Sequence, residues 1–270
     1  MTDTPQAPQP VGYTDADPCP RIEVTVPPGA DNHFLSVFRW DSAGRTAVRG
    51  AAHASISGTF FVVDFEAPLG EPVSYTAIGY DTQDRPSEPS LVSTAVTLAG
   101  DGGCPWVHDP LIPSGATRWL VTDWTERTHG RDRSVLWPIV SDVAVVITGP
   151  RQKPASTMEL ITRTDGDAQA LVVLSDSPAL LIRPDPSWGW RYGYYNVGEL
   201  EERRRVPGRP ANPDRLWSLP LTPVAPPPPE LEAPAHTWAE VIRLYDRWRS
   251  VVATKRSWLD LIRDPDPAAP

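Results

Sequence analysis

The side chains best suited to chemistry lie in one aromatic tract, WGWRYGYYNVG at residues 188–198. Aromatic rings that stand side by side can form a stacking platform for a sugar, and the candidates are Trp188, Trp190, Tyr192, Tyr194 and Tyr195. Packing explains the pattern equally well, because Trp190, Tyr192 and Tyr194 alternate as they would on one face of a strand. Aromatic residues dominate both cores and subunit interfaces. We favour packing and keep contact with a glycan as the alternative.

Hydrolysis of a glycan would require two carboxylates that converge in a cleft. The acidic residues nearest to the tract are Asp185 in a loop and Glu199, Glu201 and Glu202 in a charge cluster that runs into EERRRVPGR. Nothing in the sequence singles out an acid and a base among them. Nucleophile elbows, His-Glu-x-x-His helices, phosphate-binding loops and dinucleotide fingerprints are also absent. We therefore expect no catalytic residues and no enzyme.

The sequence indicates no metal or cofactor site. Its five histidines, at positions 33, 53, 108, 129 and 236, are scattered and never have the spacing of a ligand pair. The acidic loop DTQD lacks the ligand spacing of an EF-hand. Cys19 and Cys104 belong to no Cys-x-x-Cys pair, and we interpret both as free thiols.

Composition indicates a globular chain with few long helices. Of its 270 residues, 40% are apolar, 22% are charged and 33 are proline, which favours loops and edge strands. The net charge is −9, and no segment is basic enough to bind a nucleic-acid backbone. No apolar run approaches the ~20 residues that span a bilayer. The acidic N-terminus lacks the apolar stretch of a secretory signal, so we expect folding in the cytoplasm.

Short alternating strands begin at residue 20, after a flexible, acidic, proline-rich arm of residues 1–19. Ile22, Val24 and Val26 alternate with polar residues, as in a strand with one buried face. Trp40 is expected to fill the core, and Tyr75 to anchor its hydroxyl on backbone as tyrosine corners do. Strands at 21–26, 34–40, 46–50, 57–68, 72–81 and 91–99 predict a β-sandwich over residues 20–101.

A glycine- and proline-rich stretch at 102–115 is interpreted as a linker to a second domain, residues 116–225. One short helix is predicted there at 167–174, with Asp167 as its cap. Strand-like runs surround it at 134–140, 142–149, 156–164, 178–184, 198–204 and 215–224. We therefore expect a second β-sandwich or small barrel with one helix, and a fold class that is mainly β.

The last region begins with a proline-rich linker, residues 226–236, whose four consecutive prolines favour a stiff polyproline II rod. Residues 237–264 are predicted to form an amphipathic helix, and residues 265–270 a tail. The helix carries an aromatic stripe that must be buried, either on its own domain or in a groove of a neighbouring subunit. The candidates for that interface are Trp238, Tyr245, Trp248 and Trp258.

The first domain resembles the fibronectin type III superfamily. The resemblance rests on Trp40, the turn at 67–70, Tyr75, Ala77 and the loop DTQDRPSEPS. It implies a sandwich of the fibronectin III or immunoglobulin type. It says little about function, because such domains serve as spacers and adhesion units in many contexts.

The chain as a whole resembles the minor tail proteins of long-tailed phages that infect Actinobacteria, and more distantly distal tail proteins. The resemblance lies in the order of the phrases VVDFEAPLG, WVHDPLIP, TDWTERTHGRDRSVLWPIV, PALLIRPDPSWGWRYGYYNVGELEERR and DRLWSLPLTPV. It implies a structural virion component of the tail tip or baseplate, assembled in the host cytoplasm and acting in tail assembly and host attachment. We expect its partners to be copies of itself, in a ring, trimer or hexamer, and other tail proteins. The alternative is a carbohydrate-binding module that recognises host envelope glycans.

Overall fold

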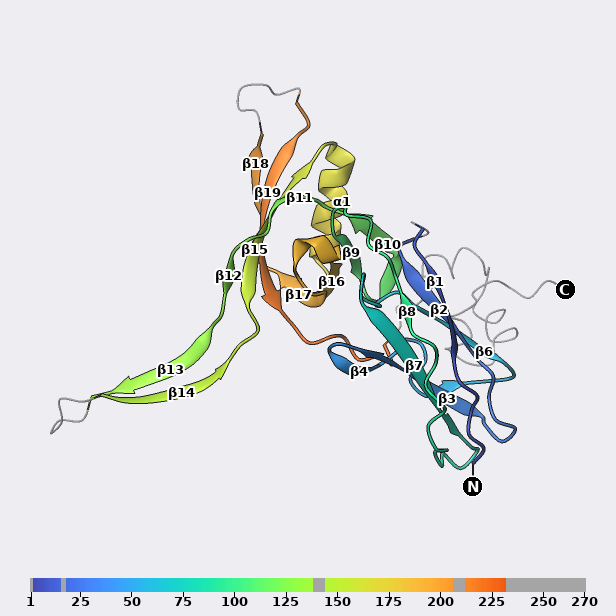
Figure 1. Ribbon diagram of the computed structural model, residues 1–270. Coiled ribbons are helices and arrows are strands. Elements are labelled where there is room, and N and C mark those ends of the chain that lie inside the picture. The colour runs from blue at the N-terminus through green and yellow to red at the C-terminus, as the bar shows by residue number, and fades with distance from the viewer. Residues whose placement is uncertain (1, 16–17, 138–143, 206–211, 232–270) are drawn as a thin grey trace, which may run out of the picture.

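The computed structural model describes residues 2–15, 18–137, 144–205 and 212–231. The chain is mainly β, with 48% strand and 6% helix, arranged as several antiparallel sheets and one α-helix. This confirms the predicted fold class and is consistent with a β-sandwich class. Figure 1 shows a first β domain, a second β domain that carries the helix, and a long hairpin that projects from the second domain. The helix predicted at 237–264 lies outside the described residues.

The first domain consists of two antiparallel sheets that share one apolar core. Alternate residues of both sheets point into this core, among them the fully buried Val24 and Val37. One sheet has the order β1 (Gln9–Tyr13), β2 (Arg21–Val26), β6 (Phe60–Asp64). The other has the order β4 (Gly44–Ala47), β3 (Phe34–Asp41), β7 (Pro72–Tyr80), β8 (Val96–Thr97), and β5 (Ala54–Ser55) also pairs with β3.

Strand parity corrects the predicted core of this domain. Arg39 of β3 points inward and is 3% exposed, so its neighbour Trp40 points outward and is 43% exposed. The Trp40 indole donates instead to the Thr76 hydroxyl at 3.1 Å. Tyr75 is fully buried, but its hydroxyl donates to the Asp64 carboxylate at 3.0 Å rather than to backbone. A buried cation therefore occupies the place where the sequence predicted a tryptophan.

The N-terminal segment, predicted as a flexible arm, is part of the sandwich. Residues 9–13 form β1, which pairs with β2 in continuous register. Thr2 is buried, and its hydroxyl donates to the backbone carbonyl of Arg85 at 3.1 Å. Prolines are tolerated here because β1 is an edge strand, where a missing N–H leaves no ladder bond unmade.

Three serines close the outer edge of β7. Ser87, Ser90 and Ser93 are buried while the residues between them are exposed, a period of three rather than the predicted alternation. Each serine pairs with one residue of β7. The serine amide donates to the carbonyl of that β7 residue, and the serine hydroxyl accepts from its amide. Three residues therefore lie opposite two of β7, an arrangement related to a β-bulge. We call residues 87–95 the serine repeat.

The second domain is one long antiparallel sheet with the order β10–β9–β16–β17–β19–β15–β11. Two short strands extend it, β12 paired with β15 and β18 paired with β19. The bounds are β9 (Trp106–Asp109), β10 (Ile112–Arg118), β11 (Leu120–Asp123), β12 (Arg127–Thr128), β15 (Ala155–Thr162), β16 (Leu180–Arg183), β17 (Gly193–Val197), β18 (Glu201–Arg204) and β19 (Arg215–Pro223), with the 3-10 turn η1 (Pro186–Trp188) before β17. Strands β9 and β10 occupy most of the predicted linker. They are stabilised there because Trp106 is buried in the core of the first domain and Val107 in that of the second.

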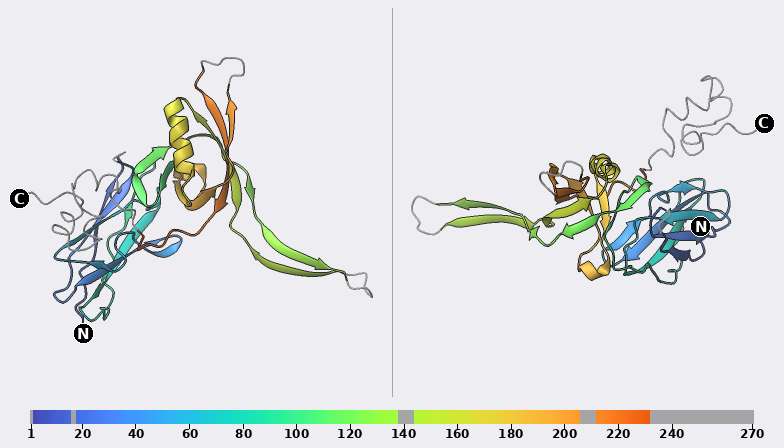
Figure 2. Two further views of the ribbon diagram at one scale, coloured as in Figure 1. Left: turned by 180° about the vertical axis from the view of Figure 1, so that it is seen from behind. Right: turned by 90° about the horizontal axis from the view of Figure 1, so that it is seen from above.

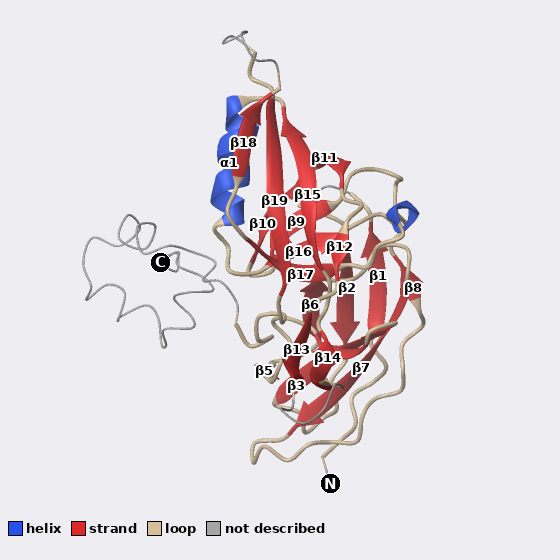
Figure 3. Ribbon diagram, turned by 90° about the vertical axis from the view of Figure 1, so that its left-hand side faces the viewer, coloured by secondary structure: helices blue, strands red, loops and turns tan. Residues whose placement is uncertain are grey.

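The helix α1 (Asp165–Ser175) is present as predicted, but its cap is Thr164 rather than Asp167. The Thr164 hydroxyl accepts from the Asp167 amide at 3.0 Å, and the Asp167 carboxylate accepts from the Thr164 amide at 3.2 Å. These reciprocal bonds form a capping box. The helix lies along one flank of the sheet, where Leu171 enters the same apolar cluster as Met158 (Figure 3).

The two remaining strands, β13 (Arg131–Leu136) and β14 (Val145–Arg151), form a separate two-stranded sheet. Among the described residues they pair only with each other. Figures 1 and 2 show this hairpin reaching out from the second domain, on the side opposite the first domain. Isolated two-stranded hairpins are marginally stable in water. The pairing of β13 with β14 therefore contributes little stability by itself.

The serine repeat generates a test of the first domain. Replacing Ser90 with alanine removes the acceptor for the buried Ala77 amide, so we expect a loss of about 1–2 kcal/mol in unfolding free energy. The matched control is Thr94→Ala, because Thr94 lies exposed in the same segment. Urea denaturation followed by fluorescence measures both. Equal stability of the two variants would contradict the role given to the serine hydroxyl.

Candidate interaction surfaces

The β13–β14 hairpin is apolar on both of its faces at the described end away from the second domain, residues 135–137 and 145–147, which we call the tip. Val135 pairs with Val146 on one face, and Leu136 pairs with Val145 on the other. All four side chains are exposed, and Trp137 beside them is 68% exposed. An exposed apolar cluster of this kind marks an interaction site in a soluble protein. Because both faces are apolar, one flat partner surface would leave half of the cluster in water.

The stem of the hairpin is basic, in a chain whose net charge is negative. Residues 127–153 contain five Lys or Arg and two Asp, whereas residues 1–101 contain five Lys or Arg and thirteen Asp or Glu. In the stem, Arg131 stands opposite Arg151, and its guanidinium donates to the Gly149 carbonyl at 3.0 Å. The projecting arm and the first domain therefore carry opposite charge.

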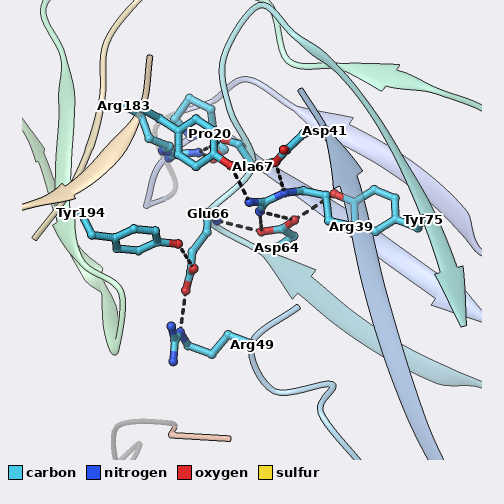
Figure 4. A network of polar contacts seen from close by, with 11 residues as sticks. Pro20, Arg39, Asp41, Arg49, Asp64, Glu66, Ala67, Tyr75, Arg183 and Tyr194 are labelled. Atoms are coloured by element: carbon cyan, nitrogen blue, oxygen red, sulfur yellow. Dashed lines mark hydrogen bonds and ion pairs between the residues drawn. The ribbon is translucent and has the colours of Figure 1, made fainter. Parts of the chain in front are cut away.

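A buried polar network joins the first domain to the second (Figure 4). Arg39 donates to both oxygens of Asp64, at 3.0 and 3.1 Å, and to Asp41 at 3.0 Å. Tyr192 of the second domain accepts from Arg39 at 3.1 Å and donates to Asp41 at 2.7 Å. Burial raises the pKa of Tyr192 to about 12, so the phenol keeps the proton that it donates. One arginine thus connects both sheets of the sandwich to the second domain.

A second branch of the network leads through Glu66. The hydroxyl of Tyr194 donates to one oxygen of Glu66, and Arg49 donates to the other at 2.5 Å. Burial, and then the adjacent carboxylate, raise the pKa of Tyr194 as well. Behind this branch, the fully buried Arg183 of β16 donates to the first-domain carbonyls of Pro20 at 2.9 Å and Ala67 at 3.0 Å. These contacts make the two domains one unit.

The proline-rich segment after β19 is bound to the first domain. Arg49 donates to the backbone carbonyls of Pro228 and Leu231, both at 2.8 Å, and of Pro227 at 3.1 Å. The amide of Gly50 approaches the Pro229 carbonyl at 3.4 Å. The sequence predicted a stiff polyproline linker at 226–236. In its described part, residues 226–231, three backbone carbonyls accept hydrogen bonds from the side chain of Arg49, which lies at least 178 positions earlier in the sequence.

The aromatic tract is used inside the chain. Trp190 stacks on Trp124 with ring centroids 5.3 Å apart, and the Arg127 guanidinium lies 3.0 Å from the Trp190 centroid. The Trp188 indole donates to the Gly103 carbonyl at 3.1 Å. Tyr192 and Tyr194 point to the first domain, as described above. Trp190 and Tyr192 precede β17, so the predicted alternation on a single strand is absent and the rings do not form one row.

Sequence reasoning missed the residues that define these surfaces, although a signal for the hairpin was present. The run AVVI at 144–147 is apolar at successive positions, which is typical of a strand buried on both faces. Within the residues that the structure describes, no layer covers this strand. Arg49 left no comparable signal, because its partners are backbone carbonyls. The interface candidates Trp238, Tyr245, Trp248 and Trp258 lie outside the described residues.

Both cysteines are free, as predicted, with Cys19 buried and Cys104 partly exposed. Across the residues that the structure describes, no three His, Cys, Asp or Glu side chains gather where they could share a metal ion. In the same residues, no helix has the length and apolar character needed to cross a membrane. No protein-family model matches the chain, and a search of curated proteins finds no match.

The Arg49 contacts predict a measurable anchoring of residues 227–231. In Arg49→Ala these residues lose three hydrogen bonds, so we expect cleavage after Glu230 by a glutamate-specific protease to become about tenfold faster. Arg49→Lys keeps a charge beside Glu66 but offers a single nitrogen, and it should also be cleaved faster. The control is Arg45→Ala, which removes an exposed arginine that packs on Phe38. Unchanged cleavage in both Arg49 variants would contradict the anchor.

His108 predicts how stability depends on pH. This residue of β9 is fully buried, and burial, aided by the charge of Arg183, lowers its pKa to about 3. The unfolded chain binds a proton near pH 6.5 and the folded chain does not, so stability is full above pH 6.5 and falls below it. We expect His108 to account for a loss of about 2 kcal/mol at pH 5 relative to pH 7.5.

Denaturation at pH 7.5 and pH 5 tests this assignment when the wild type is compared with His108→Gln, which does not titrate. The variant should lose less stability than the wild type between the two pH values. His129→Gln, an exposed histidine replaced in the same way, is the control. An identical pH dependence in the wild type and His108→Gln would assign the acid sensitivity to other groups.

Proposed function

We propose that this chain is a non-enzymatic structural subunit of a phage tail tip or baseplate. The observation that supports it best is the projecting hairpin, whose tip presents apolar side chains on both faces. Exposed apolar area costs about 25 cal/mol per Å² relative to burial, so a tip with several such side chains gains stability when protein covers it. A chain whose task is association has a use for this surface.

The partner that suits the hairpin is another copy of the chain. The hairpin segment is basic, and residues 1–101 carry thirteen acidic against five basic residues. Opposite charges on two ends of one molecule favour encounter between copies and disfavour contact between two hairpins. The repeated contact would generate a ring if the rotation closes and a filament if it does not.

The rigid connection between the domains supports the same proposal. Arg39, Tyr192 and Arg183 tie the second domain to the first, so a force or contact at one domain reaches the other. Subunits of a tail tip must hold fixed angles within a ring, and a hinged pair of domains would not provide them. The resemblance of the sequence to minor tail proteins adds the biological setting, a virion tail assembled in the host cytoplasm.

The carbohydrate-binding alternative draws no support from the aromatic tract. Its five candidate residues, Trp188, Trp190, Tyr192, Tyr194 and Tyr195, make contacts within the chain. Host attachment through other residues remains part of the proposed role of a tail-tip protein. We propose no reaction for the chain.

Hairpin substitution tests the assembly role. We expect the wild-type chain to form a defined oligomer at tens of micromolar, and Leu136→Ser combined with Trp137→Ser to shift it to monomer, because the double substitution removes apolar side chains from the tip. The control is Val173→Ser, a comparably exposed apolar residue of α1. Sedimentation velocity over a concentration series measures all three. A wild-type chain that stays monomeric over the series would contradict the proposal.

A further inference from the structure

We propose that the hairpin tip of one copy docks on the outer surface of the serine repeat of a second copy. The inference rests on the proposed assembly function and names the surface that receives the hairpin. The contact is head to tail: the donor is the apolar tip around Leu136 and Trp137, and the acceptor is the apolar pair Leu91 and Val92 with Pro89. It connects two parts of the molecule that carry exposed apolar side chains.

The acceptor is the most exposed apolar position in the described chain. Leu91 is 81% exposed and Val92 is 60% exposed, and they are adjacent in sequence. Pro89, one repeat earlier, is exposed as well. The period of three explains this exposure, because Ser90 and Ser93 point toward β7 and the residues between them must point away. The fold therefore presents these side chains on a rigid edge rather than on a loose loop.

This edge is built for contact through side chains and not for the addition of a strand. The hydroxyls of Ser87, Ser90 and Ser93 donate to the carbonyls of the residues that follow them, at 2.8–2.9 Å. Pro89 has no amide hydrogen to donate. Edges with occupied carbonyls and prolines resist strand pairing. A partner that binds Leu91 and Val92 must therefore bring apolar side chains, and the exposed ring of Trp137 is one.

Charge favours the same pairing. The acceptor shares the serine repeat with the exposed carboxylate of Glu88, and the donor carries the exposed Arg133 on the strand that leads to its tip. The hairpin segment and residues 1–101 have opposite net charge, so this pattern continues beyond the immediate contact. Such complementarity raises the rate of encounter and fixes orientation more than it raises affinity.

The position of the two surfaces requires two molecules. The hairpin projects from the second domain away from the first, and β7, which the serine repeat flanks, belongs to the first domain (Figures 1 and 2). One copy therefore cannot satisfy its own acceptor. Because donor and acceptor are different surfaces, every bound copy offers a further acceptor, as a ring requires.

Two complementary variants test the pairing. The donor variant is Leu136→Ser with Trp137→Ser, and the acceptor variant is Leu91→Asp with Val92→Asp. Each alone should be monomeric at concentrations where the wild type assembles. Mixed in equal amounts, they should form a 1:1 dimer that grows no further, because one intact acceptor meets one intact donor. Native mass spectrometry and sedimentation velocity measure this, and thermal melts by circular dichroism verify that both variants are folded.

Matched variants separate a loss of the contact from a loss of folding. Phe61→Asp places an aspartate at an exposed aromatic residue of β6, outside the acceptor, and should assemble like the wild type. Arg133→Glu should weaken association about tenfold, and Glu88→Arg on the partner should restore it, because like charges face each other in the first case and opposite charges in the second. This restoration would be unexplained if the acceptor substitutions acted only by unfolding the domain.

Failure of the inference can be told apart from failure of the proposed function. If the donor variant is monomeric while the acceptor variant assembles like the wild type, the hairpin has another receptor and the inference is wrong. The same holds if two folded variants are both monomeric and do not dimerise on mixing. If the wild-type chain never assembles, both the inference and the assembly function are overturned.

Discussion

The burial of Arg39 is the constraint on which the rest of this structure depends. Moving a guanidinium out of water costs free energy, and carboxylates with further hydrogen-bond partners offset that cost. Asp64 and Asp41 supply the charge, and Tyr192 completes the shell from the second domain. Because partners come from β3, β6 and the segment before β17, satisfying one cation fixes how two sheets and two domains meet. The inward position of Arg39 also turns Trp40 outward, so the parity of β3 follows from the same requirement.

The fixed angle between the domains also fixes the direction in which the hairpin projects. An apolar arm on a hinged domain would sample many directions, and its contacts would carry a large entropic cost. With Tyr194 and Arg183 holding the second domain to the first, the arm has one direction relative to the sandwich. The return of residues 226–231 to Arg49 adds a further link between the domains, made through backbone carbonyls. A fixed direction of this kind is what the proposed assembly role would require.

The serine repeat and the β13–β14 hairpin are two exposed edges of the molecule, and they differ in what they leave open to a partner. In the serine repeat, each serine hydroxyl donates to the carbonyl of the next residue. These carbonyls are then not free to pair with another strand, so a partner would contact the repeat through its side chains. Among the described residues, the hairpin leaves apolar side chains exposed on both of its faces, which costs free energy until another surface covers them. The first edge therefore resists strand pairing in a chain that is mainly β, whereas the second would serve the assembly role that we propose.

Local patterns in the sequence determined the strands β2, β3, β6 and β7, the helix α1 and the free cysteines, because alternation, helix propensity and cysteine spacing act over a few positions. The sequence alone did not determine that Trp40 faces outward, since that depends on which residues of β3 find partners across the core. Nor did it indicate that residues 9–13 and 106–118 form strands, because their proline and glycine content suits a loop until a neighbouring strand is present. The aromatic tract was visible as a cluster, but the partners of Trp190, Tyr192 and Tyr194 lie as many as 153 positions away. Such contacts are decided only when the two domains meet, because the free energy of burying a charge or a ring depends on the groups that surround it in space.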